Sequence, residues 1–384
     1  MRATHALLTI VGSAALLTAT AACGDDTPGA GAASPPAAAD PTATALRGGD
    51  GPSTTAPATS PAPPARGAVR TVATDLAAPW DIEFLPNRDA LVTERDSAKL
   101  LRITPGRAAQ TVMTIPGVVP GGEGGLLGLA VSPRFSEDET VYVYFTAASD
   151  NRVAKVDLGT KKVTPILTGL KKGPIHDGGA LELGPDGHLY VGVGDTGDTS
   201  NAQSRASRNG KILRITVAGK VPRGNPFKGS PIWSLGHRNV QGLAFDRSGR
   251  LWASEFGQDT TDEVNLIRPG RNYGWPVVEG KGSTQGGRFT NPLVTWSPTS
   301  SSSPSGAAIT GRELYVSALA GRKLWRIKLS GASAGRPQAL FSGRYGRIRA
   351  VAQAPDGSIW FATSNRDGRG DPRDGDDRIL QLGT

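Results

Sequence analysis

The chain has 384 residues, a net charge of +9, 51 glycines, 29 prolines and one cysteine. A single cysteine excludes a disulfide within the chain, and the scattered lysines and arginines form no compact basic cluster that would indicate a nucleic-acid partner. The apolar runs are short and closed by turn residues, with no long amphipathic helical pattern, so the composition favours an all-β fold.

Residues 1–23 have the features of an export signal. Arg2 gives a basic start, residues 6–17 are mostly apolar, and small residues lead to Cys23. A membrane span needs about 20 apolar residues, so we expect this shorter segment to be cleaved. The letters TAAC that end at Cys23 resemble a bacterial lipobox. Cys23 is therefore the candidate lipidation site, and cleavage without lipidation is the alternative.

Residues 24–67 consist almost entirely of Ala, Pro, Thr, Ser, Gly and Asp. Such a segment cannot bury apolar area, so we expect a disordered tether. A lipid on Cys23 followed by this tether predicts a lipoprotein on the outer face of the cell membrane, and without the lipid a secreted protein.

Residues 68–384 contain six copies of one pattern. Each copy has an apolar strand, a turn often spelled Pro-Asp-Gly, a second apolar strand, a polar excursion and a closing strand. The copies begin at Ala78, Leu127, Gly178, Gln241, Ser305 and Arg349. One copy is typical of a sheet of about four antiparallel strands whose faces need neighbouring sheets for burial. Six of them predict a six-bladed β-propeller of four-stranded antiparallel blades.

Two segments interrupt the repeat in its first half. The loop GGEGGLLG, from Gly121, contains Glu123, and its glycines allow the backbone to approach a ligand closely. His176 and Asp177 stand where the third repeat begins, near the expected axis, and a neutral imidazole is suited to accept a proton near neutral pH. The alternatives are a turn that only connects two blades and a structural turn histidine.

Three further segments carry polar chemistry. Arg238 and Asn239 enter the fourth repeat, where they either bind a carboxylate or cap a strand. Residues 257–263 form an acidic turn that, with residues 272–276, suits Ca²⁺; a solvated turn is the alternative. Arg347 and Arg349 would share one face of a strand and suit an acidic ligand.

These segments, in this order, resemble one family, the pyrroloquinoline quinone (PQQ)-dependent aldose sugar dehydrogenases. The resemblance extends from about Val69 to the C-terminus and rests on the phrases PWDIEFLP, LVTER, GGEGGLLGLAVSP, HDGGALELGPDGHLYVGVGDTGD, GKILRI, GHRNVQGLAFD, DEVNLIRPGRNYGWPVVEG, SPSGAA and GRIRAVAQAPDG. It implies a propeller enzyme that oxidises an aldose at C1 and transfers hydride to PQQ.

The resemblance also assigns roles to individual residues. His176 would take the C1 hydroxyl proton, and the residues that would bind the cofactor are Glu123, Arg238, Asn239, Arg347 and Arg349. Main-chain carbonyls of Gly257 and Gln258 would bind the Ca²⁺ that polarises PQQ. In some members a second, structural Ca²⁺ lies at the positions of Glu263 and Tyr273.

The chain departs from the glucose dehydrogenases at four positions. Glu123 replaces a glutamine, and a carboxylate there repels an anionic cofactor unless it is protonated or paired. Ile175 replaces an aspartate that orients the imidazole, and Asp177 follows instead. Thr196 replaces a glutamine, and Ala320 replaces a lysine that contacts the cofactor.

Two hypotheses follow. The first is a lipid-anchored or secreted PQQ-dependent aldose sugar dehydrogenase with an aldose substrate, an external electron acceptor and no membrane contact except the lipid anchor. The second, motivated by the four departures, is a cofactor-free propeller that binds carbohydrate or protein at a surface. A metal-dependent hydrolase on the same fold is disfavoured, because the loops near the axis offer arginine and histidine more than clustered carboxylates.

Overall fold

The computed structural model describes residues 62–384, and within them it is a six-bladed β-propeller. The expected signal peptide, the lipidation site at Cys23 and the tether up to residue 61 lie outside the described residues. No helix in the described part is long and apolar enough to cross a membrane. Residues 62–67 are described, and Arg66 and Gly67 contact Gly383.

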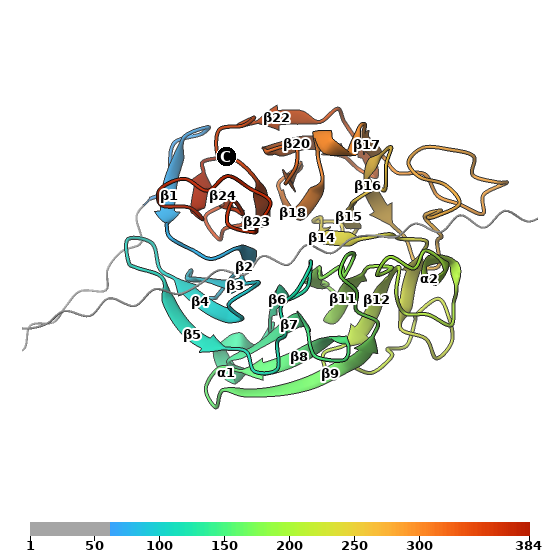
Figure 1. Cartoon of the computed structure of the whole chain (residues 1–384), viewed down its shortest axis with the longest axis horizontal. Helices are drawn as coiled ribbons and strands as arrows, with labels where there is room; N and C mark the ends of the chain where they lie inside the picture. Colours follow the sequence, from blue (N-terminus) through green and yellow to red (C-terminus); the bar gives the residue numbers. More distant parts are fainter. Residues whose placement is uncertain (1–61) are drawn as a thin grey trace, which may run out of the picture. The chain divides into compact units, whose positions relative to one another are not determined.

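The blades follow one another around the ring in chain order, and the prediction of six four-stranded antiparallel sheets is confirmed (Figure 1). In the first three blades, strands run from the centre outward in sequence order. Their bounds are β2 (Pro79–Phe84), β3 (Ala90–Glu94), β4 (Lys99–Ile103) and β5 (Gln110–Thr114); β6 (Leu126–Val131), β7 (Thr140–Thr146), β8 (Asn151–Asp157) and β9 (Lys162–Leu170); and β10 (Leu181–Leu183), β11 (His188–Val193), β12 (Lys211–Thr216) and β13 (Ile232–Leu235).

The fourth and fifth blades follow the same rule, except that two short strands, β21 and β22, share the outer position beside β20. The bounds are β14 (Val240–Phe245), β15 (Leu251–Glu255), β16 (Asp262–Ile267) and β17 (Val294–Trp296); and β18 (Pro304–Thr310), β19 (Glu313–Ala318), β20 (Lys323–Ser330), β21 (Ser333–Ala334) and β22 (Gln338–Leu340). Single helical turns occur at α1 (Phe135–Asp138), α2 (Ser200–Gln203) and η1 (Thr299–Ser301).

The sixth blade takes strands from both ends of the propeller. It consists of β23 (Ile348–Gln353), β24 (Ile359–Thr363), β25 (Ile379–Leu382) and, outermost, β1 (Val69–Ala73). β1 pairs antiparallel with β25, with Val69 opposite Leu382, and Figure 1 shows β1 beside this last blade. The ring is therefore closed by hydrogen bonds between segments that are distant in the sequence.

Apolar side chains fill the spaces between neighbouring blades. Six buried clusters occur in the described chain, one at each junction of blades. Between the second and third blades, for example, Leu127 and Tyr144 pack with Leu189 and Leu213, all of them fully buried. The alternation of side chains along a strand explains this, because both faces of each sheet meet a neighbouring sheet.

The turns that join first and second strands lie on one face of the ring, and the residues that precede the first strands lie on the other. In the third blade, Gly187 has a φ of +74° in the turn between β10 and β11, which explains the Asp-Gly pair there. The residues before β6, β10, β14 and β23 converge on the opposite face, where the sequence predicts the site.

Candidate active site

Glu123, His176 and Asn239 come together from three blade connections at the propeller axis. The backbone N–H of His176 donates to Glu123 Oε2 at 2.8 Å, and Asn239 Nδ2 donates to the same oxygen at 3.3 Å. Asn239 Oδ1 accepts the N–H of Gly178 at 3.0 Å. Each residue lies just before a first strand, so the propeller geometry explains why segments more than 50 residues apart meet.

The ring of His176 is held by Asp195, which follows the end of β11. His176 Nδ1 lies 2.7 Å from Asp195 Oδ1, and both side chains are buried. Burial acts to raise the pKa of Asp195, but hydrogen bonds from His176, Gly197 and Trp275 outweigh it and lower the pKa below its ordinary value. Asp195 is therefore ionised, and an ionised partner favours the His176 tautomer that carries its proton on Nδ1.

The other ring nitrogen, His176 Nε2, has no hydrogen-bond partner among residues 62–384. With Nδ1 protonated and bonded to Asp195, Nε2 is the basic nitrogen. This arrangement leaves His176 able to accept a proton from a ligand.

Asp177 does not orient the imidazole. Its Oδ1 accepts hydrogen bonds from Asn151 Nδ2 at 2.7 Å and from the N–H of Gly173 at 3.1 Å. Asp177 therefore stabilises the turn that carries His176. Burial raises the pKa of Asp177 to about 6. The carboxylate that orients the imidazole of His176 is that of Asp195, and neither Ile175 nor Asp177 has this role.

Asp195 has a recognisable signal, although only its neighbour Thr196 drew notice in the sequence. An acid at or just after the end of the second strand of a blade lies on the same face as the start of the first strand. Glu255, the last residue of β15, shows this placement: it accepts hydrogen bonds from His237 Nδ1 at 2.9 Å and from the N–H of Arg238.

Arg349 is a buried cation that has no carboxylate partner among residues 62–384. Its side chain donates from Nη1 to Gln241 Oε1 at 2.9 Å and to Ser305 Oγ at 3.3 Å, and its Nε has no hydrogen-bond partner in the same residues. Burial, together with the nearby charge of Arg95, lowers the pKa of Arg349 to about 9. A guanidinium in these surroundings is stabilised by an anionic ligand, so Arg349 fits the carboxylates of PQQ.

Arg347 already has an anionic partner. Its Nε and Nη2 lie 3.0 and 2.9 Å from Asp367 Oδ2. Asp367 belongs to a loop after β24 that is rich in arginine and aspartate. Arg95 reaches the carbonyl of Asp367 at 3.3 Å, and Arg369 of the same loop approaches Glu123 at 3.4 Å. Sequence reasoning did not identify Arg95, Asp367 or Arg369 as residues of the site.

Arg238 lies between the histidine and the predicted metal loop. It donates to Gln258 Oε1 from Nε at 3.0 Å and from Nη2 at 2.6 Å, and its guanidinium lies 5.6 Å from the ring centre of Trp275. Trp275 in turn donates from Nε1 to Asp195 Oδ2 at 2.8 Å. Trp275 therefore contacts the groups on both sides of the site.

The loop that carries Gly257 and Gln258 has its N–H groups turned toward Glu279. Four successive N–H groups, from Gln258 through Thr261, donate to Glu279 Oε1 at 2.7 to 3.2 Å. The carbonyl oxygens of Gly257 and Gln258 accept no hydrogen bond from the described residues. Free carbonyl oxygens are ligands that suit a hard cation such as Ca²⁺.

Glu263 and Tyr273 line a cavity of about 10 Å³ with Gly257. The oxygens of Glu263 accept from Gly280 N–H at 2.6 Å and Asn265 Nδ2 at 2.9 Å, and burial, with Glu255, raises its pKa to about 8. In the described chain no three His, Cys, Asp or Glu side chains cluster as metal ligands. A cation bound here would need main-chain carbonyl oxygens, and oxygen atoms of a bound cofactor, as its ligands.

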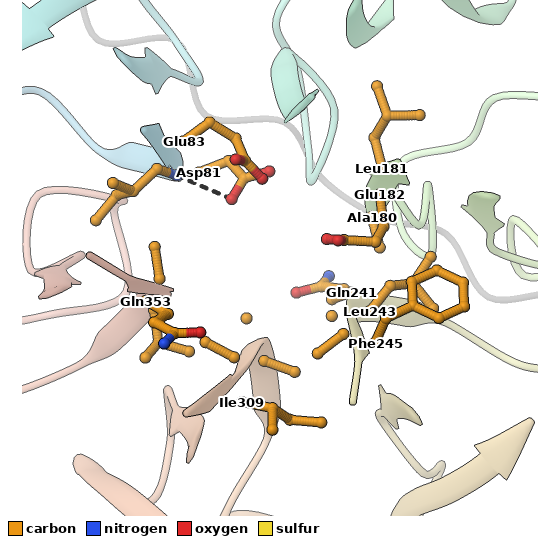
Figure 2. A pocket seen from close by; sticks show the side chains of 18 of the residues that line it. Asp81, Glu83, Ala180, Leu181, Glu182, Gln241, Leu243, Phe245, Ile309 and Gln353 are labelled. Carbon is orange, nitrogen blue, oxygen red and sulfur yellow. Dashed lines mark hydrogen bonds between the residues drawn. The ribbon is translucent and has the colours of Figure 1, made fainter. Parts of the chain in front are cut away.

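Below the site, the propeller axis contains a cavity of about 220 Å³. Figure 2 shows the carboxylates of Asp81, Glu83 and Glu182 directed into it, with Gln241 on its wall. Burial raises the pKa of Asp81 to about 7, and burial together with Asp81 raises that of Glu182 to about 8. Gln241 links this cavity to Arg349 and so to the cofactor side.

The chain matches known proteins along almost the whole propeller. Residues 76–371 match the family model described as Glucose / Sorbosone dehydrogenase. A PQQ-bound aldose sugar dehydrogenase from Streptomyces coelicolor is 50% identical, with 83% of this chain and 99% of that chain covered and a TM-score of 0.78. An aldose sugar dehydrogenase of Escherichia coli is 27% identical over 346 residues, which are 80% of this chain and 92% of that protein.

Quinoprotein glucose dehydrogenase B of Acinetobacter calcoaceticus is 31% identical over 262 residues, which are 58% of this chain and 55% of that protein. The matched residues of the family model contain His176 and Arg349 together with the predicted calcium loop. The chain therefore belongs to the glucose/sorbosone dehydrogenase family.

Proposed function

We propose that this protein is a PQQ-dependent aldose sugar dehydrogenase that oxidises its substrate at C1. The observation that carries the proposal is the presence at one site of an oriented imidazole, His176, and a buried guanidinium, Arg349, that has no anionic partner among the described residues. A PQQ-bound relative of 50% identity supports the choice of cofactor. When bound, PQQ supplies an acceptor for the hydride that leaves C1.

His176 Nε2 takes the proton of the C1 hydroxyl while the C1–H bond gives up its hydride, so the aldose loses two electrons and becomes a lactone. Asp195 stabilises the imidazolium that forms, because its carboxylate is ionised and 2.7 Å from Nδ1. Arg349 and Arg347 would hold the cofactor carboxylates, and the carbonyls of Gly257 and Gln258 would hold Ca²⁺. The cation and the arginines would supply positive charge that makes the quinone a better hydride acceptor.

Reconstitution tests this proposal. Residues 62–384 are mixed with PQQ and Ca²⁺, and dye reduction is followed after an aldose is added. Saturable PQQ binding and aldose-dependent reduction support the enzyme. Failure to bind PQQ at micromolar concentration would overturn it and favour a cofactor-free propeller that binds carbohydrate or protein.

We also propose that the protein is exported and held by a lipid on Cys23, with electrons passing to an acceptor outside the cell. The sequence of residues 1–23 supports this location. Mass spectrometry of the full-length protein from a membrane fraction tests it: a diacylated Cys23 at the mature N-terminus supports the proposal, and an unmodified soluble form contradicts it.

A further inference from the structure

The glycine-rich loop before β6 packs on the turn that carries His176. Gly122 has a φ of +60°, and a Cβ there would lie 2.1 Å from the carbonyl oxygen of Pro174. The next residue, Glu123, donates its N–H to the same carbonyl at 3.1 Å. The glycines therefore allow this loop to approach the histidine turn.

The main chain of His176 has an unusual conformation that this contact supports. Its φ is +57°, in the left-handed region where residues other than glycine incur strain of roughly 1 kcal/mol or more. The N–H of His176 donates to Glu123 Oε2 at 2.8 Å, and its carbonyl accepts from Thr196 N–H at 3.2 Å. Asp195 holds the ring, while Glu123 and Thr196 hold the backbone.

Glu123 forms an ion pair with Arg369. Arg369 Nη1 lies 3.4 Å from Glu123 Oε1, and the side chain of Glu123 is only 14% exposed. The two residues come from different blades, because Arg369 follows β24 and Glu123 precedes β6. Other charged groups also lie around Glu123 and the histidine turn. The cations are Arg95, Arg238, Arg349 and Lys172, and the carboxylates are Asp195 and Asp177.

We propose that Glu123 is a positioning residue that holds the backbone of His176 in its left-handed conformation, and that Arg369 offsets the negative charge of Glu123 so that an anionic cofactor can bind nearby. The positioning role needs no cofactor. The charge-offset role rests on the proposed function.

Amide hydrogen exchange of His176, measured by NMR on the cofactor-free protein, tests the positioning role. Glu123→Ala removes the acceptor and is expected to speed exchange of this amide about tenfold or more. Glu123→Gln keeps an acceptor oxygen and is expected to restore most of the protection. Arg322→Gln, which breaks an exposed ion pair with Asp371 on the same face, is the matched control and should leave the amide unchanged.

If exchange of the His176 amide is the same in Glu123→Ala and the wild type, the positioning role is wrong. Kinetics at saturating PQQ give a second readout. Glu123→Ala removes a negative charge and should bind PQQ at least as tightly as the wild type, yet its turnover should fall. General damage to the site would weaken both binding and turnover, and that result would also overturn the proposal.

The PQQ dissociation constant, measured by tryptophan fluorescence at low salt with Ca²⁺, tests the charge offset. Arg369→Gln should weaken binding roughly threefold to tenfold, and Glu123→Gln should tighten it by a similar factor. The double variant keeps the net charge of the pair and should bind within about twofold of the wild type.

A double variant that binds as weakly as Arg369→Gln would show that Arg369 contacts the cofactor directly, which would overturn the charge offset. Absence of PQQ binding in every variant, the wild type included, would overturn the proposed function and the charge offset together. The exchange rates of the His176 amide would still decide the positioning role.

Discussion

The imidazole of His176 is bonded to a carboxylate 19 positions later in the chain, Asp195, and not to its sequence neighbour Asp177. We expect Asp195→Asn to lower the rate of sugar-driven dye reduction on the order of 10²-fold or more, because an amide neither fixes the tautomer nor stabilises the imidazolium. Steady-state kinetics at saturating PQQ measure this. Asp177→Asn is the matched control and should mainly change thermal stability. Equal losses of turnover in both variants would contradict the assignment.

Replacing His176 by glutamine separates binding from chemistry. The variant should bind PQQ within about threefold of the wild type, since the arginines proposed to hold the cofactor carboxylates are unchanged. The reductive step should fall about 10²- to 10⁴-fold, the range that a general base contributes. Stopped-flow spectroscopy of the bound cofactor resolves the two quantities, and unchanged reduction would remove His176 from its role.

Arg349→Gln should weaken PQQ binding about tenfold or more, because a charge-assisted hydrogen bond contributes roughly 1.5–3 kcal/mol. Arg349 is the suitable target because, within residues 62–384, its hydrogen-bond partners Gln241 and Ser305 are both neutral. Fluorescence titration measures the dissociation constant, with Arg322→Gln as a control for changes in surface charge. An unchanged dissociation constant would place the cofactor carboxylates elsewhere.

Removal of divalent cations should abolish PQQ binding while the fold persists. The carbonyls of Gly257 and Gln258 lie in a loop whose N–H groups are already satisfied by Glu279, so the loop does not need a metal to keep its shape. Treatment with EGTA followed by circular dichroism and PQQ titration tests this, and Ca²⁺ should restore binding. Loss of the β spectrum on chelation would instead indicate a structural metal.

The axial cavity makes stability depend on pH. The ordinary pKa values of Asp81 and Glu182 are 3.8 and 4.5, and in the folded protein burial raises them to about 7 and about 8. Between about pH 4 and pH 8 the folded state therefore binds more protons than the unfolded state, so the free energy of unfolding decreases as the pH rises. Glu263, also raised to about 8, acts in the same direction.

Glu182→Gln should make this decrease smaller, and Glu313→Gln, which replaces a carboxylate outside the axial cavity, should not. Urea denaturation of the cofactor-free protein from pH 5 to pH 9 gives both slopes. Identical slopes in Glu182→Gln and the wild type would show that the cavity carboxylates do not cause the pH dependence.

The sequence predicted the blades because each turn and strand is a local pattern, repeated six times. It also placed His176 and Asn239 at the starts of the third and fourth repeats, and Glu123 in the loop before the second-repeat strand at Leu127, which are equivalent positions in a propeller. It did not predict the partners of these residues. Residues next to His176 in the sequence, such as Ile175 and Asp177, point in different directions from the turn, so their position in the sequence does not show which carboxylate contacts the imidazole. That carboxylate, Asp195, comes from the end of another strand.

The arginines of the site show the same limit. Strand alternation predicted both Arg347 and Arg349. Nothing local in the sequence distinguishes Arg347, which pairs with Asp367, from Arg349, which has no carboxylate partner in the described part of the chain. Arg369 lies in a long irregular loop that no periodicity describes. The ion pairs of these arginines form between residues that are distant in the sequence, so they depend on how the closed ring places the blades side by side.

The closure of that ring also sets an order of events in biosynthesis. The side chains of Arg70 in β1 and Gln381 in β25 are hydrogen-bonded at 2.7 Å across 311 positions of sequence. Since translation proceeds from the amino end, β1 exists long before its partner, and the blade that holds Arg347 and Arg349 cannot be completed until residues 379–382 have been made. We therefore expect the proposed cofactor to be loaded late, after synthesis of the last strand.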